Sequence, residues 1–209
     1  MSTNSNRPPR KKVKHYDNGE PHFLTFSCYR RFPLLSKDRT CQWFVDALEE
    51  ARTTHGFHLW AWVIMPEHIH LLLWPPFDLI SPDPHCMQGR ICGILSSIKR
   101  PMSAKAIEHL KASAPDYLRQ LTVLNANRIY HRFWQSGSGH DENVSEPDSL
   151  HALVEYIHLN PVRRGLVARP EDWGWSSYRD WEQLPDAKLK VDRTLPETLD
   201  IPWTKRSGQ

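Results

Sequence analysis

The 209-residue chain lacks several features that would assign it to a specialised class of protein. No apolar run approaches the roughly 20 residues of a membrane-spanning helix, because charged residues or proline interrupt each one early. The N-terminus has no apolar segment of the kind that directs secretion. The four cysteines form no CxxC pair, and a chain of this length does not depend on disulfides for its core. We therefore expect a reduced, cytoplasmic protein.

The charge of the chain is low overall but unevenly distributed. The net charge is +3, yet the first 15 residues hold five bases and no acid. An apolar content of 39% is too high for a disordered chain. We expect a basic flexible arm over residues 1–16, one main domain over 17–183 and a peripheral C-terminal tail over 184–209. The segment 171–200, with eight acids and four bases, is also expected to be peripheral.

The first half of the chain is predicted to form a strand, a helix and two further strands, in that order. Aromatic and β-branched residues predict strands over 22–29, 57–64 and 68–74, and a helix begins near Asp38. Simple alternation would place Trp60 and Trp62 on one face of the second strand. This order favours an α+β fold with a central antiparallel sheet.

The second half is interrupted by several prolines. The four prolines within 75–85 predict a loop or hinge, and a basic helical stretch follows. Pro101 is expected to interrupt that helix, with a restart at Ser103. A short strand is predicted over 128–135 and a flexible turn over 136–139. A further helix opens at Pro147 and is expected to end near Asn160, because the residue before a proline avoids the α conformation.

The sharpest chemical feature is the pair His68 and His70, two residues apart in an apolar strand. Side chains alternate along a strand, so both imidazoles share one face while Ile69 and Leu71 take the other. Two adjacent imidazoles on one face are suitable metal ligands. Two histidines on a solvated sheet face are the plainer alternative. The continued apolar residues favour a covered cleft.

Tyr156, in the helix after Pro147, is a second candidate. It lies off the apolar stripe of that helix and one turn before Asn160. Packing alone would explain a half-buried tyrosine. Opposite a metal held by the His pair, the phenol becomes a candidate nucleophile, because a cation stabilises both a phenolate and charge developing on a phosphate.

These residues carry a resemblance to a known family. The segment MPEHIHLLL at 65–73 is similar to the HUH motif of single-tyrosine transposases. The segment YIHLNPVRRGLV at 156–167 resembles the tyrosine-helix block of the REP-associated tyrosine transposases, of the IS200-like group. The segments FWQ at 133–135 and WSSY at 175–178 match the same branch, so the resemblance extends from about residue 22 to 181.

The resemblance implies a ferredoxin-like HUH nuclease fold with helices on one face of the sheet. It implies that His68 and His70 bind a divalent cation, Mg or Mn, with Asn160 as a third ligand. Tyr156 would attack a phosphate in single-stranded DNA near hairpins and form a 5′-phosphotyrosine link without ATP. The spacing of the histidines alone does not select Mg or Mn, because imidazole favours Zn, Fe or Ni.

The resemblance also implies a nucleoid-associated protein that binds REP-like hairpin DNA, either as a monomer or as a homodimer that exchanges tyrosines. We expect basic residues of the arm, of the 90–119 region and after Tyr156 to contact the DNA backbone, and binding to depend on salt. Two residues depart from the family pattern, Ser136 and His140. The predicted DNA contacts are Arg10, Lys11, Lys12, Lys99, Arg100, Arg163 and Arg164.

Two other functions compete with the transposase hypothesis. A hairpin-DNA binding protein that has lost catalysis would not need His68, His70 and Tyr156 together. A metal hydrolase that activates water on the same His pair would form no covalent intermediate, and Glu67 is its nearest candidate base. Tyr130 and Tyr178 are the next candidate nucleophiles if Tyr156 is not used.

Overall fold

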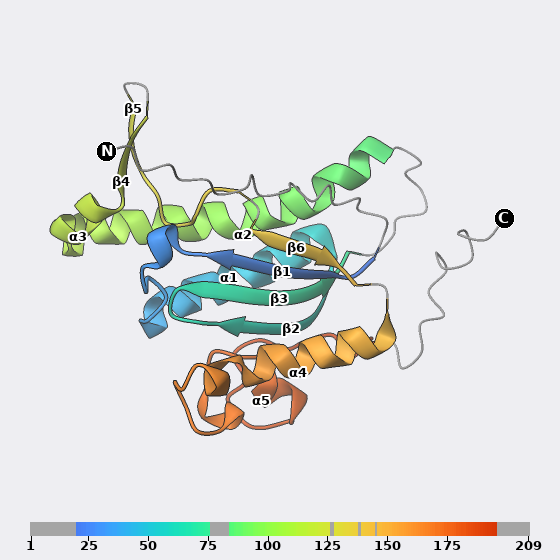
Figure 1. The fold of residues 1–209 in the computed structure, drawn as a ribbon. Coiled ribbons are helices and arrows are strands. Elements are labelled where there is room, and N and C mark those ends of the chain that lie inside the picture. Colours follow the sequence, from blue (N-terminus) through green and yellow to red (C-terminus); the bar gives the residue numbers. More distant parts are fainter. Residues whose placement is uncertain (1–19, 76–83, 126–127, 138, 145, 196–209) are drawn as a thin grey trace, which may run out of the picture.

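A four-stranded antiparallel sheet forms the centre of the fold, with its strands in the order β2–β3–β1–β6 (Figure 1). The computed structural model describes residues 20–75, 84–125, 128–137, 139–144 and 146–195. The strands are β1 His22–Ser27, β2 His58–Ile64, β3 His68–Trp74 and β6 His140–Asn143, with β4 Thr122–Asn125 and β5 Arg128–His131 as a separate hairpin. The helices are α1 Asp38–His55, α2 Pro84–Ser113, α3 Pro115–Gln120, α4 Pro147–Arg163 and α5 Tyr178–Trp181, with short 3-10 helices η1 Tyr29–Arg31 and η2 Pro170–Asp172.

Helices cover both faces of the sheet. On β3, Ile69, Leu71 and Leu73 pack into the cluster formed with α1 and α2. Leu72, on the opposite face, packs into a cluster with Ile157 of α4. The expected α+β fold with a central antiparallel sheet is confirmed. The expectation of helices on one face is corrected, because the apolar stripe of α4 needs a partner and the second face of β2 and β3 supplies it.

The strand β2 does not alternate regularly. Its pairing with β3 shifts register between Leu59 and Ala61. As a result Leu59 and Trp62 face the α1 and α2 cluster, whereas Trp60 and Ala61 both face α4. The expectation that Trp60 and Trp62 share a face is therefore wrong, because a β-bulge inserts one extra residue and inverts the alternation beyond it.

Two helices continue through prolines that were expected to stop them. Helix α2 passes through Pro101, with Ile98 and Met102 buried on either side of it. Helix α4 passes through Pro161 and ends at Arg163. A proline removes one backbone hydrogen bond but does not end a helix whose neighbours are held by packing. Asn160 and Arg163 therefore share one helix with Tyr156, which fixes their spacing along the cleft described below.

Strand β6 completes the sheet from a polar segment that the sequence did not mark as a strand. His22 of β1 and Asp141 of β6 contact each other through Nδ1 and Oδ1 at 2.7 Å, and both are buried. Gly139 precedes β6 with φ +96, and a Cβ there would lie 2.1 Å from the carbonyl oxygen of Thr25. The predicted strand over 128–135 is shorter, since β5 ends at His131 and Trp134 instead forms a bridge with Cys28. Of the loop or hinge expected over 75–85, residues 76–83 lie outside the described part.

The C-terminal segment lines the outer edge of β2 instead of lying peripherally. The indole of Trp173 donates to the carbonyl of Ile64, and the indole of Trp181 donates to that of Trp60. Ser177 hydrogen-bonds the backbone of Trp62 through both its amide and its hydroxyl. The edge strand is thereby covered, which prevents it from pairing with another chain.

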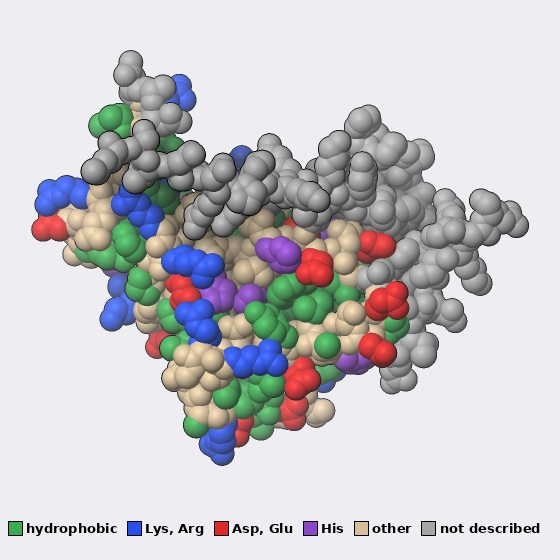
Figure 2. Space-filling view, viewed as in Figure 1, with side chains coloured by type: hydrophobic (Ala, Val, Ile, Leu, Met, Phe, Trp, Pro, Cys, Tyr) green, Lys and Arg blue, Asp and Glu red, His purple; other side chains and the backbone are tan. Residues whose placement is uncertain are grey.

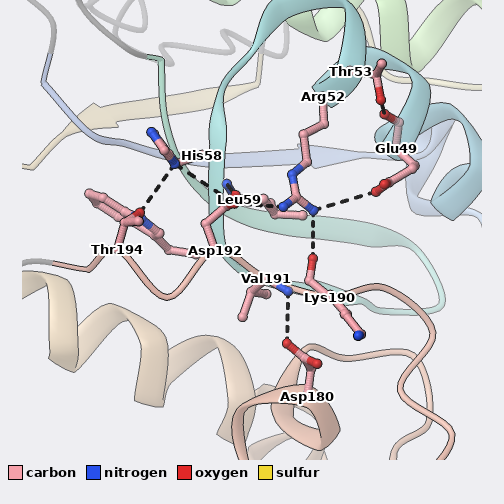
Figure 3. A network of polar contacts seen from close by, with 11 residues as sticks. Glu49, Arg52, Thr53, His58, Leu59, Asp180, Lys190, Val191, Asp192 and Thr194 are labelled. Atoms are coloured by element: carbon pink, nitrogen blue, oxygen red, sulfur yellow. Dashed lines mark hydrogen bonds and ion pairs between the residues drawn. The ribbon is translucent and has the colours of Figure 1, made fainter.

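Residues 184–195, expected in a peripheral tail, continue this cover (Figure 3). The carboxylate of Asp192 accepts from the amide of Leu59 at 2.8 Å and from the guanidinium of Arg52 at 2.8 Å. Arg52 also donates to the carbonyl of Lys190, and Asp180 accepts from the amide of Val191. These contacts tie the segment to α1 and β2. Among the described residues, no helix has the length and apolar character needed to cross a membrane.

Candidate active site

The candidate site begins on β3, where His68 and His70 are both buried on the face opposite Ile69 and Leu71. Their Nε2 atoms lie 3.0 Å apart. This close approach of two ring nitrogens indicates a point on which both imidazoles converge. The predicted arrangement of the pair on one face of a strand is therefore present in the structure.

Each imidazole has a side-chain partner at Nδ1, the ring nitrogen that does not face the other imidazole. Glu67 Oε1 lies 3.2 Å from His68 Nδ1, and the same oxygen accepts from Arg164 at 2.8 Å. Thr25 Oγ1 lies 2.8 Å from His70 Nδ1, because antiparallel pairing sets Thr25 of β1 opposite His70. Partners of this kind fix the ring orientation of metal-binding histidines.

Burial favours the neutral form of both imidazoles. Desolvation lowers the pKa of His70 to about 3, and the neighbouring His68 adds to the effect. Desolvation also lowers the pKa of His68, although the carboxylate of Glu67 opposes it. Neutral imidazole is the form that binds metals.

Helix α4 brings Tyr156 and Asn160 to the same point. The ring of Tyr156 meets that of His70 edge-on, with centroids 5.5 Å apart, and meets Phe23 at 6.0 Å. The amide nitrogen of Asn160 lies 3.3 Å from His70 Nε2. The amide oxygen of Asn160 is buried and finds no hydrogen-bond partner among the residues that the structure describes.

These side chains line one cleft of about 310 Å³. Figure 2 shows histidine side chains gathered at the centre of this face, with Lys and Arg side chains beside them. The cleft is therefore polar and bordered by positive charge. Its lining residues are Thr25, Ser27, Arg31, His68, His70, Tyr156, Asn160, Arg163 and Arg164.

The predicted DNA-contact residues separate into three groups. Arg163 and Arg164 line the cleft, and the guanidinium of Arg163 lies 5.2 Å from the ring centre of Tyr156. Lys99 does not line it, because its ammonium donates to the carbonyl of Gly137 and lies 4.6 Å from the ring centre of Phe26. Arg100 is exposed on α2 and also does not line the cleft. Arg10, Lys11 and Lys12 lie outside the described residues.

Three cleft residues were not anticipated from the sequence. Arg31 lines the cleft from the turn after β1, where Arg30 and Arg31 both adopt left-handed backbone with φ of 54 and 55. Such strain persists only where the surroundings impose it. Thr25 and Ser27 reach the cleft by strand alternation, a signal that becomes usable only once the pairing of β1 with β3 is known.

The donor set offered by the cleft is small. Among the described residues, no three side chains of His, Cys, Asp or Glu come together as a metal site. The His pair could be completed by the Asn160 oxygen after a half-turn of its amide, since that oxygen is buried without a partner. The site therefore offers two imidazole nitrogens and one carboxamide oxygen, with a phenol and arginines nearby.

A curated bacterial protein is similar to this chain in sequence. A Haemophilus influenzae protein that carries the provisional name REP-associated tyrosine transposase is 27% identical over 181 residues, spanning 77% of this chain and 91% of that protein. The chain resembles the REP-associated tyrosine transposases. The resemblance inferred from the sequence motifs is confirmed by this relative.

The fold is also similar to that of a solved protein. A solved structure of a REP-associated tyrosine transposase bound to a REP hairpin matches with a TM-score of 0.54 at 22% identity, covering 88% of this chain and 93% of that one. At this identity the match supports the fold alone. No family model matches the chain. The comparisons thus support a DNA-processing enzyme related to transposases and leave the details of the reaction to the site.

Proposed function

We propose that the protein is a metal-dependent, single-stranded DNA transposase that cleaves and rejoins strands near hairpins through a covalent link to Tyr156. The observation that carries the proposal is the contact between Tyr156 and His70 in a cleft that also holds His68 and Asn160. A packing role alone would not require a phenol, two neutral imidazoles and three arginines around one hollow. The tyrosine meets the His pair of its own chain, so a partner subunit is not needed to complete the cleft.

The reaction is a transesterification at one phosphodiester. The phenol oxygen of Tyr156 loses its proton and attacks the phosphorus, and the bond from phosphorus to the 3′ oxygen breaks. The departing 3′ oxygen takes up a proton and becomes a 3′-hydroxyl. The 5′ phosphate remains on the tyrosine, so the phosphodiester energy is conserved and a 3′-hydroxyl of another strand can reverse the step without ATP.

The cleft fits a divalent cation held by His68 Nε2, His70 Nε2 and the oxygen of Asn160. The fit rests on the convergence of two ring nitrogens and on the partnerless amide oxygen of Asn160. Such a cation would stabilise charge on the phosphate and on the phenolate. We propose Mg or Mn, following the family resemblance, with phosphate oxygens of the DNA adding the oxygen ligands that these ions prefer.

Arginines at the rim are suited to bind the DNA backbone. Arg31, Arg163 and Arg164 approach the cleft from the turn after β1 and from the end of α4. Guanidinium groups bind phosphate oxygens in paired hydrogen bonds and carry no sequence information by themselves. The structural relative was solved with a REP hairpin, and we propose that this chain also binds hairpin DNA with an adjoining single strand.

A water-using hydrolase is less well supported. The nearest carboxylate, Glu67, contacts both His68 and Arg164, which leaves it poorly disposed to remove a proton from water. A binding protein without catalysis would leave the buried Asn160 oxygen and the His pair without a role. The transposase reaction uses all of these groups.

The proposal is tested by looking for a covalent protein–DNA adduct on a hairpin oligonucleotide with a single-stranded flank, in the presence of Mn²⁺. We expect a denaturation-resistant adduct with wild type, and none with Tyr156→Phe although that variant still binds the DNA. Tyr178→Phe is the matched control, because Tyr178 lies on α5 outside the cleft lining, and it should still form adduct. Multiple-turnover cleavage without any adduct would support the hydrolase instead.

A further inference from the structure

Glu67 lies at the junction of the two elements that build the cleft. One of its oxygens, Oε1, lies 3.2 Å from His68 Nδ1 and 2.8 Å from the guanidinium of Arg164. The Glu67 side chain is only 13% exposed, whereas that of Arg164 is 51% exposed. A largely covered carboxylate thus contacts the His strand and the end of the tyrosine helix at the same time.

The carboxylate determines which nitrogen of His68 carries the proton. An ionised carboxylate can only accept hydrogen bonds, so His68 must donate from Nδ1. A neutral imidazole then has its lone pair on Nε2, the atom that faces His70. The threonine behind His70 cannot impose the same choice, because a hydroxyl both donates and accepts. Of the two imidazoles, His68 is therefore the one with a dictated tautomer.

The ion pair also fastens the end of α4. Arg164 is the C-cap residue of that helix, and its amide bonds the carbonyl of Asn160. Glu67 lies just before β3, and its backbone carbonyl accepts from the amide of Cys28 at the start of the turn that bears Arg31. Glu67 is consequently fixed by its own backbone while its side chain reaches across the cleft rim.

We propose that Glu67 is a positioning residue that presents His68 Nε2 to the cation and, through Arg164, holds the helix of Tyr156 and Asn160 against the His strand. The inference rests on the proposed function and adds a residue to it. Glu67 touches neither the cation nor the DNA in this role. It acts through His68 and through Arg164.

The tautomer is tested first, in the metal-free protein, by long-range ¹H–¹⁵N NMR of the histidine side chains at neutral pH. We expect His68 to carry its proton on Nδ1 in wild type. In Glu67→Ala we expect a shift toward the Nε2-protonated form. The isosteric Glu67→Gln keeps an acceptor oxygen and should retain most of the Nδ1–H form. If the Nδ1–H form is unchanged in Glu67→Ala, the proposal is wrong.

Metal affinity is tested next by electron paramagnetic resonance of free Mn²⁺ titrated with DNA-free protein. Glu67→Ala should bind Mn²⁺ about 10- to 100-fold more weakly than wild type, as expected for a partner behind a metal-binding histidine. Arg164→Ala should lose less, because His68 keeps its acceptor. Arg169→Ala is the matched control, since its exposed pairs with Glu171 and Asp172 lie outside the cleft lining, and its affinity should equal that of wild type.

The link to α4 has its own measurement, hydrogen exchange at the backbone amides of residues 160 and 162–164. Glu67→Ala and Arg164→Ala should accelerate exchange there by a similar factor, and Arg169→Ala should not. Equal exchange in all of these variants would overturn the positioning of the helix. If His68→Ala binds Mn²⁺ as tightly as wild type, the proposed function is wrong. If Glu67→Ala binds Mn²⁺ as tightly as wild type and His68→Ala does not, only the proposed role of Glu67 is wrong.

Discussion

The two faces of the central sheet bury side chains of different kinds, although they belong to the same strands. Toward α1 and α2, the buried residues of β3 are Ile69, Leu71 and Leu73, in the larger apolar cluster. Toward α4, β3 presents two histidines followed by Leu72. Helix α4 lies on this side, and it brings a phenol and a carboxamide as well as an apolar stripe. The change from apolar to polar occurs between neighbouring residues of one strand.

We therefore expect the α1 and α2 face mainly to stabilise the fold and the α4 face to carry the reactive groups. On the α1 and α2 face, Ile69, Leu71 and Leu73 of β3 exclude water with side chains that need no hydrogen bonds. The α4 face keeps polar groups buried only because each imidazole has a partner behind it, and because the cleft remains open to solvent and substrate. Substitutions at neighbouring positions of β3 should therefore affect different properties. Those on the α4 face should lower activity, and those on the α1 and α2 face should lower stability.

The largest effect on activity is expected from His70→Ala. Removal of one of the two imidazoles should abolish Mn²⁺-dependent adduct formation, with a loss exceeding the roughly 10- to 100-fold typical of partners behind metal ligands. The free energy of unfolding should fall by less than in Leu71→Ala. Adduct yield with hairpin DNA and urea unfolding measure the two quantities. Adduct formation at the wild-type rate would contradict the role of His70.

The converse change is Leu71→Ala, one residue along the same strand. Leu71 is completely buried in the α1 and α2 cluster, so its truncation should cost about 2–5 kcal/mol in the free energy of unfolding. Well below its melting temperature the variant should still form adduct. Urea unfolding measures the loss. A variant that is stable but inactive would show that the two faces are not separable.

A smaller effect on stability is expected where β6 joins the sheet. Gly139→Ala would bring a Cβ to 2.1 Å from the carbonyl of Thr25, the residue that holds His70. Gly137→Ala is a matched control, because it has a similar φ of +94 but nothing within 4 Å. Thermal unfolding should give a cost for Gly139→Ala about 1–3 kcal/mol above that of Gly137→Ala. Equal costs would mean that the close approach to β1 is unimportant.

The smallest effect concerns Lys99, on the apolar side. Burial lowers its pKa to about 8, so the folded state disfavours its charged form. Because the folded pKa is below the unfolded value, stability is gained as pH rises and lost as pH falls through about 8. Between pH 7 and 9 the stability of wild type should therefore rise by about 1 kcal/mol relative to Lys99→Met. Urea unfolding at both pH values checks this, and a constant difference would contradict it.

The sequence predicted the parts of the site that depend on local periodicity. His68 and His70 alternate with apolar residues, and Tyr156 and Asn160 lie off the apolar stripe of α4, so each pattern could be recognised within one element. The strands β1, β2 and β3 were also predicted, because aromatic and aliphatic residues dominate them. The resemblance of two separate motifs then joined the elements into one site.

The features that were missed depend on contacts between distant segments. Strand β6 is polar and is held by the pairing of Asp141 with His22, which no local pattern indicates. The β2 bulge reverses the faces of Trp60 and Trp62 and follows from pairing with β3. Helix α4 continues past Pro161 because packing outweighs one lost hydrogen bond. Likewise the segment 184–195 carries no local pattern of a helix or strand, yet Asp192 is fixed by Arg52 and Leu59.

The central claim is that Tyr156 becomes covalently attached to DNA. Mass-spectrometric mapping of the residue linked to DNA, after reaction of wild-type protein with a hairpin substrate and Mn²⁺ and digestion of both polymers, tests it most directly. We expect a peptide containing Tyr156 that carries a 5′-linked nucleotide on the phenol oxygen. A nucleotide on Tyr130 or Tyr178, or cleaved DNA with no modified tyrosine, would contradict it.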